Sequence, residues 1–370
     1  MGETVDITGA VAESASAVTD RPEARLRLSA IVPARNEAAV LEECLRSLVA
    51  QSEAGFALGV EWELIVVDDD SSDGTREISG KYEREGVVVI AAPLLDLSDR
   101  GGFTGKTNAC WAGAQRARGA WLLFTDADTV HEMGDLSRAL HEAKRYGAAL
   151  LSYSPRQIVT GFWQRAVMPL VFSELASVYP PKQVSDPTSR LAAANGQFLL
   201  VEREAYFAVG GHRGVGREIL EDVALARKVK QAKHGIRFRY APDALATRMY
   251  RTLPEMVEGW TKNLALLFPQ PLWMAAWRAL DLVLFLGLPA LALALLPSRP
   301  LWQSAVIWAI WLRTLWRFYA RAARSKFAAG DVAISILGVP LFCWLLVRSE
   351  MQHRVWRSVG WKGRSYTVGR

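Results

Sequence analysis

The sequence contains little cysteine and little histidine. Its 370 residues include three cysteines, Cys44, Cys110 and Cys343, and five histidines. The cysteines lie too far apart for the spacing of a metal site, and they form no disulfide framework. This scarcity argues against a disulfide-stapled secreted domain and is typical of a reduced, cytoplasmic compartment.

The sequence also lacks an apolar run near its start. Residues 1–25 are rich in Ala, Ser, Thr, Glu and Asp, and we expect a disordered tail there. Neither a signal peptide nor a myristoylation pattern is expected. The net charge is +6, but Lys and Arg cluster in the C-terminal third beside apolar runs. Basic residues in that position set membrane orientation, so we expect a membrane and no nucleic acid as partner.

Long apolar runs appear after Leu272. They cover residues 279–297, 301–316 and 332–347, and a membrane-spanning helix needs at least about 17 residues. The second run is short and the third is at the lower length limit, with 16 residues each. Three apolar runs in succession are nonetheless unusual for a soluble domain. We therefore expect a multi-pass protein of the cell membrane. Its transmembrane region would cover residues 271–348, with two to three apolar segments, and a basic cytoplasmic tail would cover residues 349–370.

The basic segments around these runs raise the question of whether the chain crosses the membrane an even or an odd number of times. Residues 317–326 and the tail are both basic, so both belong on the cytoplasmic side. Three full crossings would leave the tail outside. One interpretation has two crossings, with the third run dipping into the membrane and returning at Gly338 and Pro340, where irregular backbone needs shielding by protein or water.

Residues 26–265 alternate apolar strands with helices. The runs AIVPA, ELIVVD, GVVVIAA and WLLF are short and continuous, and Leu41, Leu45 and Leu48 recur at helical spacing. This pattern predicts an α/β fold with a Rossmann-like, mostly parallel sheet covered on both faces. In such sheets, ligands bind beyond the carboxyl ends of the strands.

Two acidic clusters follow predicted strands. Asp68, Asp69 and Asp70 end one strand, and Asp126 and Asp128 end another. Alternate residues of a strand point to the same face, so we expect Asp126 and Asp128 to project together. Two like charges at one place favour a cation between them, and a hard divalent ion takes oxygen ligands and phosphates. Helix caps and turns use the same Asp-x-Asp letters, but the strand context and the other acids favour Mg²⁺ or Mn²⁺ bridged to a diphosphate.

A series of motifs resembles glycosyltransferase family 2, whose members have the GT-A nucleotide-diphospho-sugar transferase fold. The motifs are IVPARNEA, IVVDDDSSDGT, GKTNACWAG, LLFTDADT, ANGQFLLVEREAYFAVGGH, EILEDVALARKVK and RMYRTLPEMVEGWTKN. Together with the tail motif WKGRSY, they also resemble membrane-associated members that glycosylate lipids such as carotenoids or hopanoids. The resemblance implies a GT-A domain over residues 26–265 and inverting, metal-dependent transfer of a hexose from a UDP-sugar to a lipid acceptor.

The resemblance also implies a role for each matching residue. Asp222 is the expected catalytic base, and Asp126 and Asp128 are the expected metal ligands, with Asp126 also near the sugar nucleotide. Either Asp68 or Asp69 is expected on the base or ribose. The other expected nucleotide-sugar ligands are Pro33, Arg35, Asn36 and Glu37 on the first loop, Lys106 near the charged part of the donor, and Arg248, Arg251 and Trp260 in a motif closing over the diphosphate.

One motif departs from the family pattern, and several residues have plainer explanations. GWTKN replaces the Gln-x-x-Arg-Trp form of processive members, which argues against polymer synthesis. Residues 160–180 are either an interfacial segment or an ordinary core helix. The plainer readings are an ion pair of Asp222 with Arg227 or Lys228, a turn cap at Asp70, and a structural His131 in preference to a third metal ligand; His212 is a candidate neighbour of the acceptor.

Two other functions stay open at this level. A polyprenyl phosphate acceptor is already an anion, so it would need no strong base and would favour extra basic residues nearby. A non-catalytic membrane scaffold with a transferase-like domain would be expected to lose its carboxylates, yet Asp126, Asp128 and Asp222 are all present.

Overall fold

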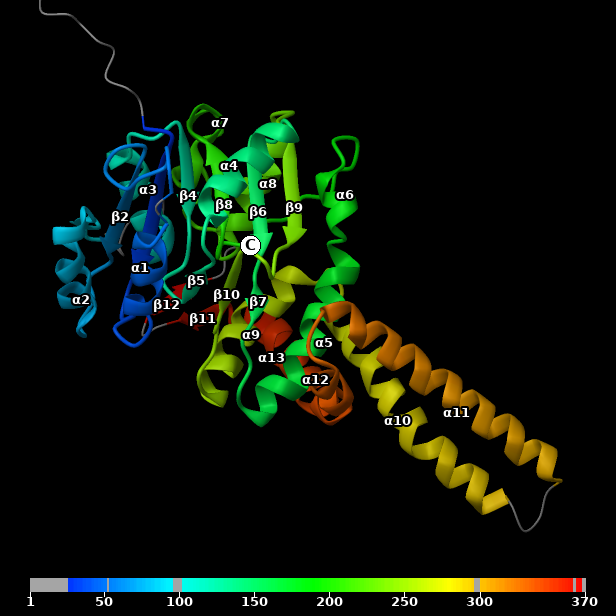
Figure 1. Cartoon of the computed structure of the whole chain (residues 1–370). Coiled ribbons are helices and arrows are strands. Elements are labelled where there is room, and N and C mark those ends of the chain that lie inside the picture. Colours follow the sequence, from blue (N-terminus) through cyan, green and yellow to red (C-terminus); the bar gives the residue numbers. More distant parts are fainter. Residues whose placement is uncertain (1–25, 52, 96–101, 296–299, 362–363, 368–370) are drawn as a thin grey trace, which may run out of the picture.

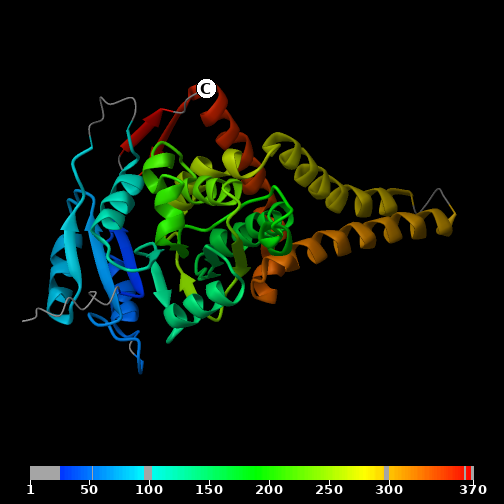
Figure 2. The ribbon, with the colours of Figure 1, turned by 90° about the horizontal axis from the view of Figure 1, so that it is seen from above.

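The computed structural model describes residues 26–51, 53–95, 102–295, 300–361 and 364–367. The tail expected over residues 1–25 lies outside these ranges. A body built around a mixed sheet carries a long helical hairpin, formed by α10 (Pro271–Leu295) and α11 (Leu301–Ala322). The hairpin extends away from the body, as both views show (Figures 1 and 2).

The central sheet has seven strands in the order β3-β2-β1-β4-β8-β6-β9. Neighbouring strands pair in parallel, except that β8 is antiparallel to both β4 and β6. The expected mostly parallel sheet is therefore confirmed. The strands are β1 Leu28–Ala34, β2 Trp62–Asp68, β3 Val88–Ala91, β4 Trp121–Phe124, β6 Leu150–Ser154, β8 Leu199–Glu202 and β9 Ile236–Tyr240.

Helices cover both faces of this sheet. On β1, Ala30 and Val32 pack into one buried cluster with α1 and α4, whereas Ile31 packs into another with α3 and α8. This alternation explains why the strand sequences are continuously apolar. The helices of the body are α1 Leu41–Val49, α2 Thr75–Lys81, α3 Gly105–Arg116, α4 Asp135–Arg145, α6 Pro181–Ser185, α7 Arg203–Ala208 and α8 Glu221–Gln231, with short helices η1 Tyr82–Glu85 and η2 Gly211–Val215.

A small sheet lies at the carboxyl edge of the central one. Its order is β5-β10-β7, and a separate hairpin is formed by β11 and β12. Because β10 pairs with β5 directly after the Asp126–Asp128 turn, this sheet fixes the loops that frame the site. The strands are β5 Thr129–His131, β7 Arg156–Gln157, β10 Leu245–Thr247, β11 Ser358–Trp361 and β12 Arg364–Thr367.

A helical module with its own apolar core joins the sheet to the hairpin. Val167, Met256, Trp260, Phe342 and Leu345 are among the buried residues of this core. Its elements are α5 Phe162–Val178, α9 Leu253–Leu267, α10 Pro271–Leu295, α11 Leu301–Ala322, η3 Ala323–Ser325, α12 Ala329–Ile334, η4 Ser335–Gly338, α13 Val339–Met351 and η5 Gln352–Trp356.

Two apolar segments of the sequence are packed inside this module. Helix α5 buries most of its length, with Phe162 and Trp163 exposed at its start, so it packs as a core helix. The third apolar run forms α12, η4 and α13. Its Gly338 approaches α5 so closely that a Cβ would lie 2.3 Å from the Ala166 carbonyl oxygen. The third run is thus packed against α5 at Gly338, and its dip into the membrane stays a prediction.

By length and composition, two helical stretches of the described residues are able to cross a membrane. Pro271–Leu295 has a mean hydropathy of 1.9 and Ala329–Trp356 one of 2.0. They differ in burial, because 11% of the first window and 39% of the second lie inside the protein. Helix α10 is thus largely exposed, beside α11, whereas α13 is held in the body.

Candidate active site

A cavity of about 690 Å³ opens at the carboxyl ends of the strands, between the sheet and the helical module. Of the residues predicted for the site, Asp68 alone does not line it. The cavity brings together Pro33, Arg35, Asn36, Glu37, Asp69, Lys106, Asp126, Asp128, Asp222, Arg248, Arg251 and Trp260.

Asp126 and Asp128 lie in a turn and not on a strand. Strand β4 ends at Phe124, and the turn is fixed because Thr129 donates its backbone N–H (3.2 Å) and its hydroxyl (2.7 Å) to the carbonyl of Asp126. The prediction that Asp126 and Asp128 project together because they alternate on a strand is therefore wrong. Both carboxylates nonetheless reach one cavity. Among the described residues, no group of three or more His, Cys, Asp or Glu side chains is placed to hold a metal by itself.

Lys106 joins two acidic side chains across the cavity. It lies in the first turn of α3, where the Thr104 hydroxyl caps the helix by accepting from the backbone N–H of Thr107. Its Nζ is 2.7 Å from Asp126 Oδ1 and 2.9 Å from Glu221 Oε1. Burial alone would lower the pKa of Lys106, but these two carboxylates raise it well above its ordinary value. Lys106 is therefore a fixed positive charge in the site.

Asp222 lies in the first turn of α8 and faces the same cavity. Its Oδ2 accepts a hydrogen bond of 2.8 Å from the backbone N–H of Gly196. Burial, followed by the charge of Glu221, raises the pKa of Asp222 to about 6, although Lys106 opposes the shift. Within the described part of the chain, Asp222 forms no ion pair with Arg227 or Lys228, so the structure does not support that plainer reading.

Gly196 allows this cluster to close. A Cβ at this position would lie 2.9 Å from Lys106 Nζ and 3.6 Å from Asp222 Oδ2. A side chain there would push the lysine out of place, whereas the glycine lets the backbone approach and hold the aspartate. Gly196 thus positions both charged groups.

The first loop and the end of β2 are tied to each other. Arg35 donates to the backbone carbonyls of Asp69 and Asp70. Asn36 adopts a left-handed conformation with φ of 52°, and its Oδ1 accepts from the Ser72 N–H at 2.9 Å. Asp69 faces the cavity, whereas Asp68 accepts from the Ser71 N–H at 3.3 Å. Of the two aspartates, Asp69 is therefore placed to meet a ligand.

The basic and aromatic motif forms the opposite wall. Arg251 donates to the carbonyl of Ala39, which links the start of α9 to the first loop. Arg248 donates to the Thr160 hydroxyl at 3.0 Å. Trp260 is 2% exposed and its Nε1 donates to Met168 Sδ at 3.3 Å, so it is mainly a core residue at the cavity wall.

Both histidines considered as site residues are structural. His131 Nδ1 lies 2.7 Å from Asp135 Oδ2, and its Nε2 lies 3.0 Å from the Thr125 hydroxyl, all of them buried. His212 is hydrogen-bonded to the Tyr206 hydroxyl at 2.9 Å. Burial, together with the charge of Lys106, lowers the pKa of His212 to about 3. Neither ring lines the cavity.

Sequence reasoning missed three residues of the site. Glu221 binds Lys106, Gly196 binds Asp222, and Lys262 of α9 lines the cavity, where burial lowers its pKa although nearby carboxylates oppose the shift. The sequence marked these residues by position alone. Glu221 directly precedes Asp222, and Gly196 and Lys262 lie within motifs that resemble the family.

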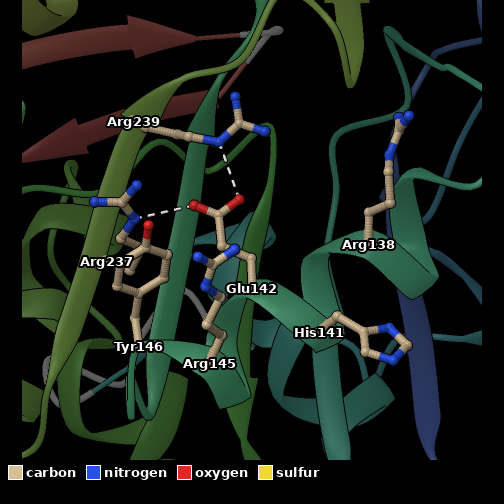
Figure 3. A pocket seen from close by; sticks show the side chains of 7 residues that line it. All are labelled: Arg138, His141, Glu142, Arg145, Tyr146, Arg237 and Arg239. Carbon is tan, nitrogen blue, oxygen red and sulfur yellow. Dashed lines mark hydrogen bonds and ion pairs between the residues drawn. The ribbon is translucent and has the colours of Figure 1, made fainter.

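A second hollow, of about 460 Å³, lies on α4 and β9 (Figure 3). Arg237 and Arg239 bind the two oxygens of Glu142 at 2.9 and 3.1 Å, and Arg237 stacks on Tyr146. These arginines are thus engaged with the protein itself. None of the predicted site residues is there, and we place the chemistry in the larger cavity. The second hollow is lined by Arg138, His141, Glu142, Arg145, Tyr146, Arg237 and Arg239.

A mostly parallel sheet whose carboxyl ends frame a cavity with clustered acids, a fixed lysine and a carboxyl group of raised pKa is the arrangement of an active site in an α/β enzyme. The chain belongs to glycosyl transferase family 2, since the model of that family matches residues 29–223, more than half of its length. The expected fold and enzyme class are confirmed.

Relatives and solved structures extend this comparison. The chain is 28% identical over 354 residues to the 4,4'-diaponeurosporenoate glycosyltransferase of Staphylococcus aureus strain MRSA252, covering 93% of this chain and 89% of that one. It is similar to the mannosyltransferase PcManGT from Pyrobaculum calidifontis in complex with GDP-Man and Mn²⁺ (TM-score 0.49, 18% identity, 90% and 88% covered). It is also similar to S. aureus TarS 1-349 in complex with UDP-GlcNAc (TM-score 0.43, 14% identity, 93% and 97% covered).

Proposed function

We propose that this protein transfers a hexose from a UDP-sugar to a membrane lipid, with inversion at the anomeric carbon. The observation that carries the proposal is the single cavity shared by Asp126, Asp128, Lys106 and Asp222. The relative's name supports a lipid acceptor, because it names a carotenoid acid. That name supports the lipid class and not the acceptor group, since a carboxylate, unlike the hydroxyl proposed here, brings no proton to remove.

Asp222 is the base of this reaction. As the acceptor hydroxyl attacks the anomeric carbon, its oxygen forms the new glycosidic bond and its proton passes to the Asp222 carboxylate. The bond from the anomeric carbon to the diphosphate oxygen breaks, and its electron pair leaves with the nucleoside diphosphate. The Gly196 N–H fixes the carboxylate for this transfer, and its raised pKa makes it a stronger base than an ordinary aspartate.

Asp126 and Asp128 would hold a divalent ion, Mg²⁺ or Mn²⁺. Two carboxylates lining one cavity fit an ion that completes its shell with water and donor phosphates. When bound, the ion supplies Lewis-acid stabilisation of charge on the leaving diphosphate. Lys106 and Arg251 add fixed positive charge beside the same group. Pro33, Arg35, Asn36, Glu37 and Asp69 form the nucleotide side, with Arg248 and Trp260 on the far wall.

The α10–α11 hairpin would cross the membrane twice and return the chain to the side of the catalytic body. Trp273, Val283 and Trp316 are 61%, 64% and 70% exposed, which is unfavourable for large apolar side chains in water. Helix α11 has 22 residues, or about 33 Å of length, and a bilayer core measures about 30 Å. It is less apolar than the two stretches that qualify as candidate spans, so its crossing rests on its length and on its packing beside α10. With α13 held in the body, two crossings leave both basic segments in the cytoplasm, where the nucleotide sugar is found.

A polyprenyl phosphate acceptor remains the second candidate, because one observation favours it. Arg324 and Lys326 line the end of the cavity at η3, where an anionic acceptor would require basic residues. The two functions differ in their need for Asp222, since a phosphate acceptor arrives without a proton to remove.

The test is the Asp222→Asn variant. We expect it to bind UDP-sugar as the unaltered protein does and to lose turnover by ~10²-fold or more, in the range for removal of a general base. Glu77→Gln serves as control, because Glu77 is an exposed carboxylate on α2 that pairs with Lys81. Unchanged turnover of Asp222→Asn with a hydroxyl lipid would remove Asp222 from the mechanism, and unchanged turnover with a polyprenyl phosphate alone would favour the second candidate.

A further inference from the structure

We propose that the apolar arm of the cavity along α5 is the acceptor site, where the terminal segment of a long-chain lipid alcohol enters from the bilayer at the root of the α10–α11 hairpin. This inference rests on the proposed function, because it assumes that the sugar passes to a lipid hydroxyl beside Asp222. It adds where that lipid binds and from which side it arrives.

One face of α5 forms the wall of this arm. Phe172, Leu175, Ala176 and Tyr179 all line the cavity and are half-buried. Their spacing of three, four and seven residues places them in one stripe along the helix. The stripe is about 10 Å long, given a rise of about 1.5 Å per residue. An apolar strip of this shape fits an extended hydrocarbon chain and offers little to a sugar or a phosphate.

The arm is continuous with the catalytic cluster. Phe172 packs edge-on against Trp260 at a ring separation of 6.2 Å, so the stripe meets the wall that carries the basic and aromatic motif. At its other end the Tyr179 hydroxyl donates to the carbonyl of Leu267 at 2.9 Å, which ties α5 to the end of α9. The same cavity contains Asp222, so a chain lying on the stripe reaches the proposed base without leaving the cavity.

The Phe172 end of the arm lies near the root of the hairpin, because Phe172 packs against Phe327, directly after Lys326, at a ring separation of 5.7 Å. Arg324, Ser325 and Lys326 line the cavity, and they follow α11 directly. The other leg, α10, begins at Pro271, shortly after α9 ends at Leu267 beside the arm. If the hairpin lies in the bilayer, the mouth of the cavity lies at the membrane surface, with two cations at the height of the lipid headgroups.

The size of the cavity limits what enters. A volume of about 690 Å³ lies within the range of about 300–1,000 Å³ that holds a single drug-sized ligand. The cavity must take the sugar nucleotide as well. A long lipid therefore inserts its reactive end and a short segment of chain, while the rest of its chain stays in the membrane.

The test uses hexadecanol carrying a diazirine as a probe, with the full-length protein in vesicles of phosphatidylcholine and phosphatidylglycerol. After illumination we expect the label on the peptide containing Phe172 to Tyr179. Ala176→Trp, which fills the arm, should reduce this labelling at least about tenfold, and Ala176→Leu should reduce it less. Ser177→Trp is the matched control, because Ser177 is an exposed neighbour on α5 that does not line the cavity.

Binding of UDP-sugar, measured on the same samples, separates the two levels of the proposal. Nucleotide binding that persists in both tryptophan variants shows that they fold. Labelling confined to α10 and α11, or labelling of α5 equally reduced by Ser177→Trp, would overturn the acceptor site while leaving the transferase intact. Absence of nucleotide binding in the unaltered protein would instead overturn the proposed function, and with it this inference.

Discussion

At the scale of single residues, the site is an arrangement of opposite charges at short distance. Lys106 lies between Asp126 and Glu221, and the burial of Asp222 beside Glu221 explains its raised pKa. The sequence pattern and the family resemblance together singled out Asp126, Asp128 and Asp222, and the structure brings the three into one cavity. The sequence alone did not single out Glu221 or Gly196. Their roles depend on tertiary contacts, of Glu221 with Lys106 of α3 and of Gly196 with Asp222 of α8.

The raised pKa of Asp222 leads to a pH dependence. A base must be deprotonated to accept a proton, and the pKa of Asp222 in the folded protein is about 6. Transfer to a hydroxyl acceptor should therefore be full above this value and fall as the pH decreases through about 6. A pH profile of kcat/KM checks this. The acid limb should disappear in Asp222→Asn, and its persistence there would assign it to another group.

Gly196 gives a second prediction at this scale. Gly196→Ala would place a methyl group 2.9 Å from the end of the Lys106 side chain, so that the flexible lysine moves and the fold stays. We expect kcat/KM to fall by about 10²-fold, the scale of a misplaced catalytic group, with little change in the melting temperature. Gly80→Ala on α2 is the control, because nothing lies within 4 Å of its added Cβ. Equal activity of the two variants would contradict the role of Gly196.

At the scale of elements, periodicity predicted the first half of the fold well. The strands β1, β2, β3 and β4 and the helix α1 lie where the apolar residues placed them. Composition could not separate the apolar helices of the C-terminal part. Helix α13 and helix α10 are similarly apolar, yet Phe342 and Leu345 are fully buried, whereas Val283 is 64% exposed. Tertiary packing on α5 and α9 makes that difference, and the sequence does not encode it locally.

The exposed hairpin gives a prediction at this scale. Charged residues near the middle of a spanning helix cost about 2.5–3.5 kcal/mol each. We expect Val283→Lys combined with Leu286→Lys, at two exposed positions of α10, to release much of the protein from vesicles in a flotation assay. Val60→Lys, at an exposed apolar position of the body, should leave binding unchanged. Equal flotation of all three proteins would show that the hairpin is not the anchor.

At the scale of the whole molecule, the hairpin and the cavity share one end. Arg324 of η3, which follows α11 directly, lines the cavity, and Figure 1 shows the hairpin leaving the body near α5. In the proposed topology, anchoring and catalysis would be joined at this place. With α10 and α11 as the two crossings, the body stays on one side of the membrane and the hairpin tip reaches the other. The charges of the sequence raised the question of how often the chain crosses the membrane, and the burial of α13 supports the proposal of two crossings.

Cysteine labelling in intact cells tests this topology. Leu301→Cys at the start of α11, where the side chain is 77% exposed, should react with an impermeant maleimide added outside. Arg354→Cys, on the body, should react only after the membrane is opened. The native Cys44 and Cys110 are buried and should not contribute, and Cys343 is replaced by serine in both variants. Outside labelling of Arg354→Cys would exclude a cytoplasmic body.

The most direct measurement of the central claim is sugar transfer itself. The purified protein in vesicles would be given UDP-hexose, Mn²⁺ and a lipid extract of the source membrane, and the lipids would then be examined by mass spectrometry. The account predicts a lipid that gains one hexose, with the gain lost in excess chelator and in Asp222→Asn. Full transfer in excess chelator, or sugar released only to water with no lipid altered, would contradict it.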